Sequence, residues 1–234
     1  MKIVLPPAVS IIVPVLNESG IINRTIKDLI SASAGFNTEI IIVDGDPAGS
    51  TIKDVYSREV ITITHSPGRG PQMNAGAAIA KGSVLLFLHA DTRLPAGAIG
   101  DVIKVCSQPT IAGGAFSLGI DSGKQIYRLI ETWANIRSRL LRIPYGDQAI
   151  FIKKNIFINI GGFAMIPLME DIEIMKRMKH NGLKIKLIDK AVTTSARRWE
   201  KEGLIYCIIR NNMLSGLFHA GVKASTLNRH YTHI

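Results

Sequence analysis

Carboxylate, amide and imidazole side chains follow directly after four apolar stretches in the first half of the chain. These polar residues are Asn17 and Glu18, Asp44 and Asp46, His65, and His89 with Asp91. Any one of them is equally well explained as a helix cap or a turn residue. If the four stretches are strands of one parallel sheet, their carboxyl ends meet at the edge where such sheets bind ligands. The four positions together therefore favour a binding site.

Three further groups of charged residues could take part in chemistry. Glu170 and Asp171 begin a predicted helix, where acidic side chains also stabilise the helix dipole. Arg197 and Arg198 could hold a diphosphate through charge-assisted hydrogen bonds, or they could form an ordinary solvated turn. Arg69 lies between two glycines, where it is either a phosphate ligand or an exposed loop residue.

The common phosphate-binding motifs are absent. A dinucleotide fingerprint that begins with Gly68 and Gly70 would need its third glycine where the chain has Met73. The sequence also contains no Gly-Lys-Ser or Gly-Lys-Thr, which excludes a P-loop. A nucleotide would therefore have to be held by a metal ion together with basic side chains.

The charge of the chain is distributed unevenly. The 234 residues carry 28 Lys and Arg against 18 Asp and Glu, a formal charge of +10. Residues 1–117 contain 9 basic and 9 acidic residues, whereas residues 118–234 contain 19 and 9. A half with this surplus suggests phosphate, an anionic membrane surface or nucleic acid as a partner. A hydrophobic content of 47% is sufficient for a large core and excludes intrinsic disorder.

The compartment is predicted to be reducing and cytoplasmic. Cys106 and Cys207 are far apart and belong to no C-x-x-C pair, so neither a disulfide framework nor a cysteine zinc site is expected. The first residues lack the pattern of a signal peptide. Since no apolar stretch reaches ~18 residues, no transmembrane helix is expected.

Strand and helix patterns alternate along the chain. Continuous apolar strands separated by helices predict an α/β fold with a mostly parallel central sheet covered by helices on both faces. The predicted strands are residues 10–16, 39–44, 60–65, 83–88, 111–118, 148–152 and 183–188. The predicted helices are residues 20–34 with Ser19 as N-cap, 50–57, 71–81, 96–107, 124–142, 171–181 and 204–218. No linker marks a second domain, so residues 1–234 are expected to form one.

Several motifs occur in an order that resembles family-two glycosyltransferases. They are PVLNE (14–18), VDGD (43–46), RGPQMNAGAAIAKG (69–82), FLHADT (87–92), GGAF (113–116), GDQ (146–148), GGF (161–163), MED (169–171) and ARRW (196–199). The chain looks most like the small branch called radical-SAM/selenodomain-associated transferases. The resemblance implies the GT-A fold, with residues 1–117 binding a nucleotide-diphospho-sugar and the basic residues 118–234 binding the acceptor.

The resemblance also implies the donor-binding residues. Asn17, Glu18 and one member of the Asp44 and Asp46 pair would hold base and ribose. Asn74 belongs to the N-x-G motif. The arginine that often precedes this asparagine is replaced by Met73, and Arg69 could substitute for it.

A divalent metal, Mn²⁺ or Mg²⁺, is implied at the end of the fourth strand. Similar enzymes have D-x-D there, and this chain has His89-Ala90-Asp91. Asp91 matches a metal-ligand position and can act with phosphates and water. His89 is either a second ligand, which would favour Mn²⁺, or a hydrogen-bonding residue that does not touch the metal.

The catalytic carboxylate is implied by the MED motif. In similar inverting enzymes the Asp of this motif is the general base, so Asp171 takes that role here, with Asp147 and Glu170 as rivals. Arg197, Arg198 and Trp199 resemble the Q-x-x-R-W element of processive members. Ser195 stands where that element has Gln, which argues against a role for Trp199 in holding a growing chain.

The function implied is inverting, metal-dependent transfer of a sugar from a UDP- or GDP-linked donor to an acceptor hydroxyl. Two alternatives stay open: a catalytically silent protein that binds nucleotide-sugars or anions, and a sugar-phosphate nucleotidyltransferase. The latter should carry a glycine-rich basic signature after the first strand, which PVLNESG is not. Nucleic acid is not expected as a partner, because aromatic residues for base stacking make up only 6% of the chain.

Residues 204–218 predict a basic amphipathic helix. Leu204, Ile205, Ile208, Ile209 and Leu217 lie on or near one face. Such a helix suits the inner face of an anionic membrane and a lipid-linked acceptor. The alternative is that this face packs on the protein's own core. The sequence leaves the oligomeric state open.

Overall fold

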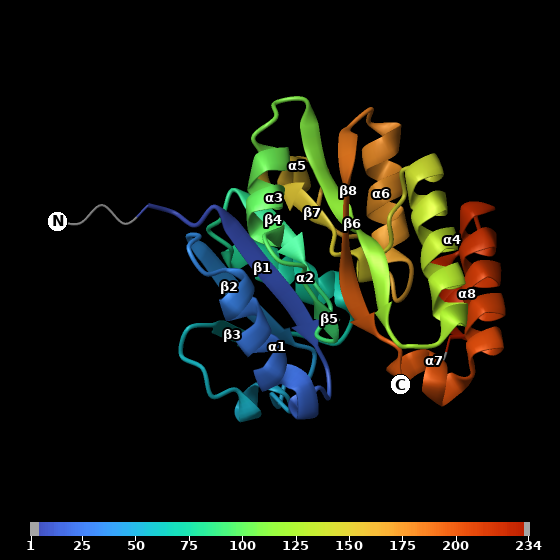
Figure 1. Ribbon diagram of the computed structural model, residues 1–234, viewed down its shortest axis with the longest axis horizontal. Helices are drawn as coiled ribbons and strands as arrows, with labels where there is room; N and C mark the ends of the chain where they lie inside the picture. Colours follow the sequence, from blue (N-terminus) through green and yellow to red (C-terminus); the bar gives the residue numbers. More distant parts are fainter. Residues whose placement is uncertain (1–4, 232–234) are drawn as a thin grey trace.

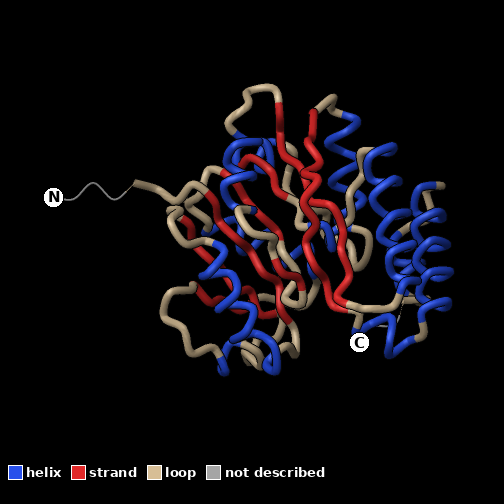
Figure 2. Tube along the Cα trace, viewed as in Figure 1, coloured by secondary structure: helices blue, strands red, loops and turns tan. Residues whose placement is uncertain are grey.

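One eight-stranded mixed sheet runs through the protein in the order β3-β2-β1-β4-β7-β6-β8-β5 (Figures 1 and 2). The computed structural model describes residues 5–231. The strands are β1 (Val9–Val15), β2 (Thr38–Asp44), β3 (Ile61–Thr64), β4 (Val84–Phe87), β5 (Thr92–Arg93), β6 (Ile111–Asp121), β7 (Phe151–Lys153) and β8 (Lys184–Ser195). Strands β3, β2, β1 and β4 pair with one another in parallel, and so do β6 and β8. Strand β7 is antiparallel to its neighbours β4 and β6, and β5 is antiparallel to β8.

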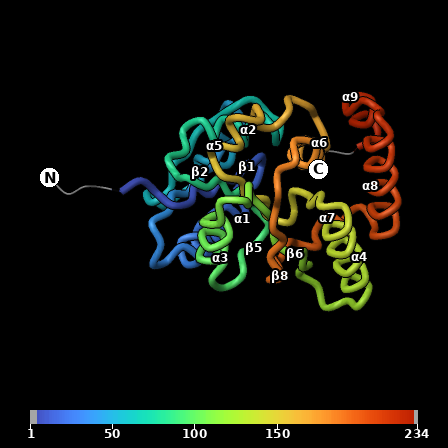
Figure 3. The backbone as a smooth tube through the Cα atoms, turned by 90° about the horizontal axis from the view of Figure 1, so that it is seen from above, coloured from blue at the N-terminus to red at the C-terminus, as the bar shows by residue number. Residues whose placement is uncertain are grey.

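Helices cover both faces of this sheet. They are α1 (Ser19–Ala32), α2 (Arg69–Ile79), α3 (Ala98–Cys106), α4 (Gln125–Leu141), α5 (Lys154–Asn159), α6 (Glu170–His180), α7 (Arg197–Glu202), α8 (Leu204–His219) and α9 (Ala224–Asn228), with 3₁₀ turns η1 (Ile52–Asp54) and η2 (Gly146–Gln148). The core on one face contains α1 and α3, and the core on the other contains α2, α5 and α6. Helices α4 and α8 stand at the end of the molecule beyond β6 and β8 (Figures 1 and 3). The predicted α/β fold, with a mostly parallel sheet between helical layers, is confirmed.

The apolar patterns explain the two layers. In β1, Ile11 and Val13 enter the core shared with α1, while Ile12 enters the core shared with α2. A parallel strand buried on both faces must be apolar at every position, which is why residues 9–15 are almost uniformly so. Close approach needs glycine: a Cβ on Gly76 of α2 would lie 2.6 Å from Ile12 Cγ2.

Some expected local features differ. Ser19 is the first helical residue rather than the N-cap, and its hydroxyl donates to the Ser50 carbonyl instead. The expected helix 50–57 is only the 3₁₀ turn η1. The strand expected from residue 148 begins at Phe151, because Gly146–Gln148 form the turn η2.

Helices α4 and α8, at the end of the molecule beyond β6 and β8, expose apolar side chains. In α4 only Tyr127 and Ser138 are buried, so the apolar residues at 126, 129, 133, 136 and 140 face outward. In α8 the residues Cys207, Arg210, Leu214 and Ser215 are buried instead. Over residues 5–231 we find no helix with the length and apolar character needed to cross a membrane.

Candidate functional site

The carboxyl ends of β1, β2 and β4 carry the polar residues singled out in the sequence. These strands are neighbours and parallel, so Asn17 and Glu18, Asp44 and Asp46, and His89 and Asp91 follow strand ends at the same edge of the sheet. Asn17 has a left-handed backbone with φ of 56°. His65 follows β3, which is an edge strand of the sheet, and its Nδ1 forms a hydrogen bond with the hydroxyl of Ser66.

Asp44 and Asp46 occupy different environments. Asp44 is fully buried, and its carboxylate accepts hydrogen bonds from the main chain of Asp46 at 3.0 Å, Thr51 at 2.7 Å and Ile52 at 3.1 Å. It therefore holds the loop after β2 in shape. Asp46 is partly exposed, and the Ala48 N–H, followed by the Ser50 hydroxyl, lowers its pKa. Of this pair, Asp46 is the carboxylate that faces solvent.

Helix α2 contributes two amide side chains that position neighbouring segments. Gln72 is buried, and its Nε2 donates to the carbonyls of Val15 at 2.8 Å and Val43 at 2.7 Å, which ties the ends of β1 and β2 together. Both ends of the Asn74 amide group bond with the main chain of Phe163, at 2.8 and 2.9 Å. Asn74 thus fixes the loop that contains Gly162 and Phe163.

Three motifs far apart in the sequence converge beyond β4. The Gly146 N–H donates to Asp171 Oδ2 at 2.7 Å, and the Ile172 N–H donates to Asp171 Oδ1 at 2.8 Å. A Cβ built on Gly146 would lie 3.1 Å from His89 Nε2 and 3.3 Å from Asp171 Oδ2. His89, the turn η2 and the start of α6 therefore meet at one point. No larger residue would fit at Gly146 without displacing a site side chain.

The acidic residues of this cluster are close enough to raise one another's pKa values. Burial, and then the neighbouring Asp171, raise the pKa of Glu170, whose side chain is almost inaccessible. Burial raises the pKa of Asp147 to about 6, against the opposing effect of Arg137. Carboxyls with pKa values displaced toward neutrality are typical of sites that transfer protons.

Arg69 is the first residue of α2, and although the residue is exposed, its charge interacts with this acidic cluster. Desolvation lowers its pKa, but Glu170, then Tyr231, Asp171 and Asp91 outweigh that effect and raise it. Gly70, the next residue, packs against the same cluster: a Cβ there would lie 3.6 Å from Glu170 Cβ. Arg69 is therefore an exposed cation at the border of the acidic cluster.

His89 is neutral at physiological pH. Desolvation lowers its pKa to about 3, and the charges of Arg69 and Arg198 add to that effect. A neutral imidazole can ligate a divalent cation, and the partly exposed carboxylate of Asp91 lies two residues away. Across the described part of the chain, no group of three or more His, Cys, Asp or Glu side chains is assembled to hold a metal. A metal would fit here only if its bound substrate supplied further oxygen ligands.

The ARRW segment lies against the first strand end. Arg197 donates to both oxygens of Glu18, at 3.0 and 3.1 Å, across 179 residues of sequence. Arg198 bonds with Glu202 at 3.3 Å. The Trp199 ring instead packs edge-on against Tyr127 of α4, with centroids 5.9 Å apart. The two arginines therefore border the site, while Trp199 contributes to packing.

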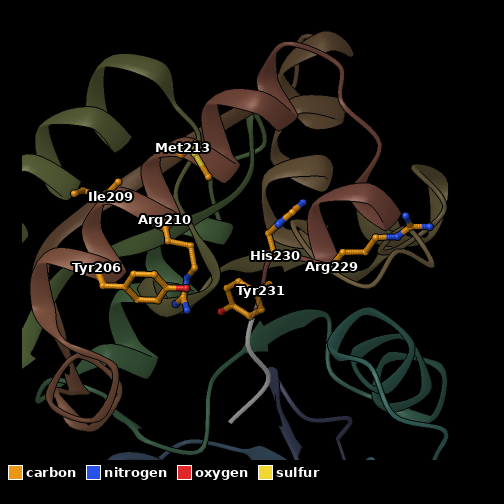
Figure 4. A pocket seen from close by; sticks show the side chains of 7 residues that line it. All are labelled: Tyr206, Ile209, Arg210, Met213, Arg229, His230 and Tyr231. Carbon is orange, nitrogen blue, oxygen red and sulfur yellow. The ribbon is translucent and has the colours of Figure 1, made fainter.

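A pocket of about 580 Å³ lies between α8 and the segment after α9 (Figure 4). Its lining residues are Tyr206, Ile209, Arg210, Met213, Arg229, His230 and Tyr231. Arg210 is buried and forms an ion pair with Glu202 at 2.6 Å. Figure 4 shows its guanidinium between Tyr206 and Tyr231, whose ring centroids lie 5.1 and 4.9 Å from it. Arg198 also lies 4.5 Å from the centroid of the Tyr231 ring, so this pocket lies beside the ARRW segment.

The structure adds residues that the sequence patterns did not indicate. The Cζ atom of Arg137, on α4, lies 3.2 Å from the centroid of the Tyr145 ring, and the charge of Arg137 opposes the burial that raises the pKa of Asp147. Gln148 is buried and its amide oxygen accepts from Ser138 at 2.7 Å, which fixes the turn that carries Asp147. Gln148 could have been suspected from the GDQ motif. Arg137 and Tyr231 carry no comparable signal in the sequence.

Comparisons with known proteins agree with this architecture. The family model described as "Glycosyl transferase family 2" matches residues 10–170. The chain is 24% identical to the "Probable glycosyltransferase YdaM" of Bacillus subtilis (strain 168) over 225 residues, which covers 84% of this chain and 51% of that protein. The fold is similar to that of a mannosyltransferase, PcManGT, from Pyrobaculum calidifontis, solved in complex with GDP-Man and Mn²⁺. For that structure the TM-score is 0.59 at 16% identity, with 82% of this chain and 57% of the other covered.

The chain spans about half the length of the relatives it matches. The family model nevertheless covers more than half of this chain, from β1 to the start of α6, and includes every strand end of the site. The mixed sheet, with its polar strand ends and helices on both faces, is a GT-A fold. The chain belongs to glycosyl transferase family 2.

Proposed function

We propose that the protein is an inverting, metal-dependent glycosyltransferase. It moves a sugar from a UDP- or GDP-linked donor to an acceptor hydroxyl. The observation that carries this proposal is the convergence of His89, the η2 turn with Asp147, and the α6 start with Asp171 beside the strand ends. Family membership and the fold shared with a mannosyltransferase solved with GDP-Man and Mn²⁺ support it.

Residues 1–117 form the donor-binding half in this proposal. Asn17, Glu18 and Asp46 border the space for base and ribose, and Asp44 holds the loop that carries Asp46. Asp91, with His89 as the second candidate ligand, would hold Mn²⁺ or Mg²⁺, which would neutralise charge on the donor diphosphate. Arg69, Arg197 and Arg198 supply further positive charge for the departing nucleoside diphosphate.

Asp171 is the general base. Its carboxylate is fixed by the N–H groups of Gly146 and Ile172, so it is oriented before the acceptor arrives. It takes the proton of the acceptor hydroxyl as that oxygen attacks the anomeric carbon from the face opposite the diphosphate. The new C–O bond forms while the bond from the anomeric carbon to the diphosphate oxygen breaks, so the configuration inverts. Asp147 is the rival base.

Residues 118–234 form the acceptor-binding half. We infer that the acceptor is lipid-linked and that the protein works at the cytoplasmic face of a membrane. The support is the basic excess of this half and the exposed apolar residues of α8.

A panel of nucleotide-sugars incubated with and without Mn²⁺ or Mg²⁺ tests the proposed reaction. We expect metal-dependent release of UDP or GDP from one donor, and sugar of inverted configuration in the product observed by NMR. Asp171→Asn should abolish most of this release, whereas Asp189→Asn, on the exposed surface, should not. Binding of a nucleotide-sugar without release under any metal condition would instead identify a silent binding protein.

A further inference from the structure

Exposed apolar side chains are concentrated on α4 and α8. Of the nineteen large hydrophobic residues exposed between residues 5 and 231, eleven belong to these two helices. On α4 they are Ile126, Leu129, Trp133, Ile136, Leu140 and Leu141; on α8 they are Ile205, Tyr206, Ile209, Met213 and Leu217. Exposed apolar side chains gathered on two helices in this way mark an interaction surface.

The residues form stripes rather than scattered points. On α4 the spacing alternates between three and four residues from Ile126 to Leu140, which places them along one side of the helix. The other side of α4 packs through Tyr127 against Trp199 and the start of α8. Figures 1 and 3 both place α4 and α8 at the same end of the molecule, remote from β1–β3.

Charge identifies the kind of partner. The exposed basic residues of 124–142 are Lys124, Arg128, Arg139 and Arg142, against one acidic residue in that range. Residues 199–229, which include α8, expose Lys201, Lys223 and Arg229 and contain two acidic residues. The side chains of Arg128 and Arg139 on α4 are each 52% exposed. Two copies of this surface facing each other would bring like charges together, which is unfavourable. An anionic bilayer complements both the apolar stripes and the cations around them.

We propose that α4 and α8 form a docking face for an anionic membrane surface. The apolar stripes enter the boundary between headgroups and acyl chains, and the surrounding arginines and lysines contact lipid phosphates. Trp133 suits this depth, because tryptophan prefers the membrane–water interface. Ile209 and Met213 belong both to this face and to the pocket beside the ARRW segment, so docking would bring that pocket to the lipid surface. The inference deepens the proposed function, since it assigns the membrane contact to specific residues.

Vesicle flotation of the full chain tests the docking face. We expect binding to vesicles of phosphatidylglycerol and phosphatidylcholine, at least ~10-fold weaker binding to phosphatidylcholine alone, and weakening by added salt. Leu129→Ser with Trp133→Ser on α4, and separately Ile209→Ser with Met213→Ser on α8, should each reduce binding at least ~10-fold. The matched control is Tyr56→Ser with Ile158→Ser, which removes exposed apolar residues elsewhere.

Trp133 fluorescence provides a second readout. Emission should shift to the blue on addition of anionic vesicles, and Trp133→Phe should lose this shift. Wild type that fails to float, or α4 and α8 variants that float like the control, would overturn the proposal. Dimerisation in solution that the α4 variant abolishes, without vesicle binding, would assign the face to a second copy instead. Donor hydrolysis measured without vesicles reports on the proposed reaction separately from docking.

Discussion

The three carboxyl groups of the acidic cluster have distinct environments, and the roles proposed for them rest on this difference. Asp171 is oriented by two main-chain N–H groups, as a base must be before its substrate binds. Glu170 is nearly inaccessible, and burial and then Asp171 raise its pKa, so in this proposal it does not contact the substrate. Asp147 lies between these cases, half-buried and with its pKa raised to about 6.

Replacement of Asp171 by Asn should separate binding from chemistry. The amide preserves the shape of the side chain but cannot accept the hydroxyl proton. Turnover should therefore fall by ~10²–10⁴, the usual cost of losing a general base, while donor affinity stays near the wild-type value. Steady-state kinetics and donor titration measure the two effects. Near-normal turnover would transfer the role of base to Asp147.

Replacement of Asp147 by Asn should stabilise the protein in a pH-dependent way. With its pKa raised from 3.8 to about 6, the folded wild type retains a proton that the unfolded chain releases between these values. Wild-type stability should therefore fall as the pH rises through this window. The Asn variant avoids this loss, and its free energy of unfolding should exceed that of wild type by ~1–3 kcal/mol at pH 8 and by little at pH 4.

Urea unfolding at the two pH values measures this difference. Asp54→Asn, at an exposed carboxylate, is the control and should show no comparable change between pH 4 and pH 8. An Asp147→Asn variant equal in stability to wild type at pH 8 would show that the folded protein does not raise the pKa of Asp147.

At the scale of elements, the long periodic segments were predictable and the short ones were not. Apolar runs and helix periodicity placed seven of the eight strands. The missed elements are short: β5 has two residues, α9 has five, and α5 and α7 have six each. Elements of this length are fixed by tertiary contacts, such as the pairing of β5 with β8, which no local pattern records.

Strand β6 packs so closely against its neighbours that position 114 requires a glycine. A Cβ on Gly114 would lie 2.0 Å from the main-chain oxygen of Lys186 on β8 and 2.6 Å from the Phe151 ring. Because a backbone oxygen cannot yield as a flexible side chain does, Gly114→Ala should destabilise the protein by more than ~3 kcal/mol. Gly123→Ala is the control, since a Cβ there meets no atom within 4 Å. Equal melting temperatures for the two variants would contradict this packing.

At the scale of the whole molecule, the site joins both halves of the sequence. The motif order resembled family-two glycosyltransferases, and that family assignment is confirmed. The sequence could indicate Glu18 and Arg197 separately, but not that they form an ion pair across 179 residues. Nor could it show that Asn74 is bonded on both sides to Phe163, or that Tyr231 folds back beside Arg198 and Arg210. Such contacts depend on the path of the chain, which residue types alone do not specify.

The central claim is that Asp91 holds a divalent metal together with the diphosphate of the donor. Thermal unfolding with Mn²⁺ and a nucleoside diphosphate tests this claim most directly. Asp91 is the only acid in the His89-Ala90-Asp91 segment, and no cluster of three potential ligands lies among residues 5–231. Metal alone should bind weakly, whereas UDP or GDP would supply the missing oxygen ligands. We predict a rise in melting temperature only when Mn²⁺ and one of these nucleotides are both present, and loss of that rise in Asp91→Ala. A full, metal-dependent rise in Asp91→Ala would contradict the assignment of this site.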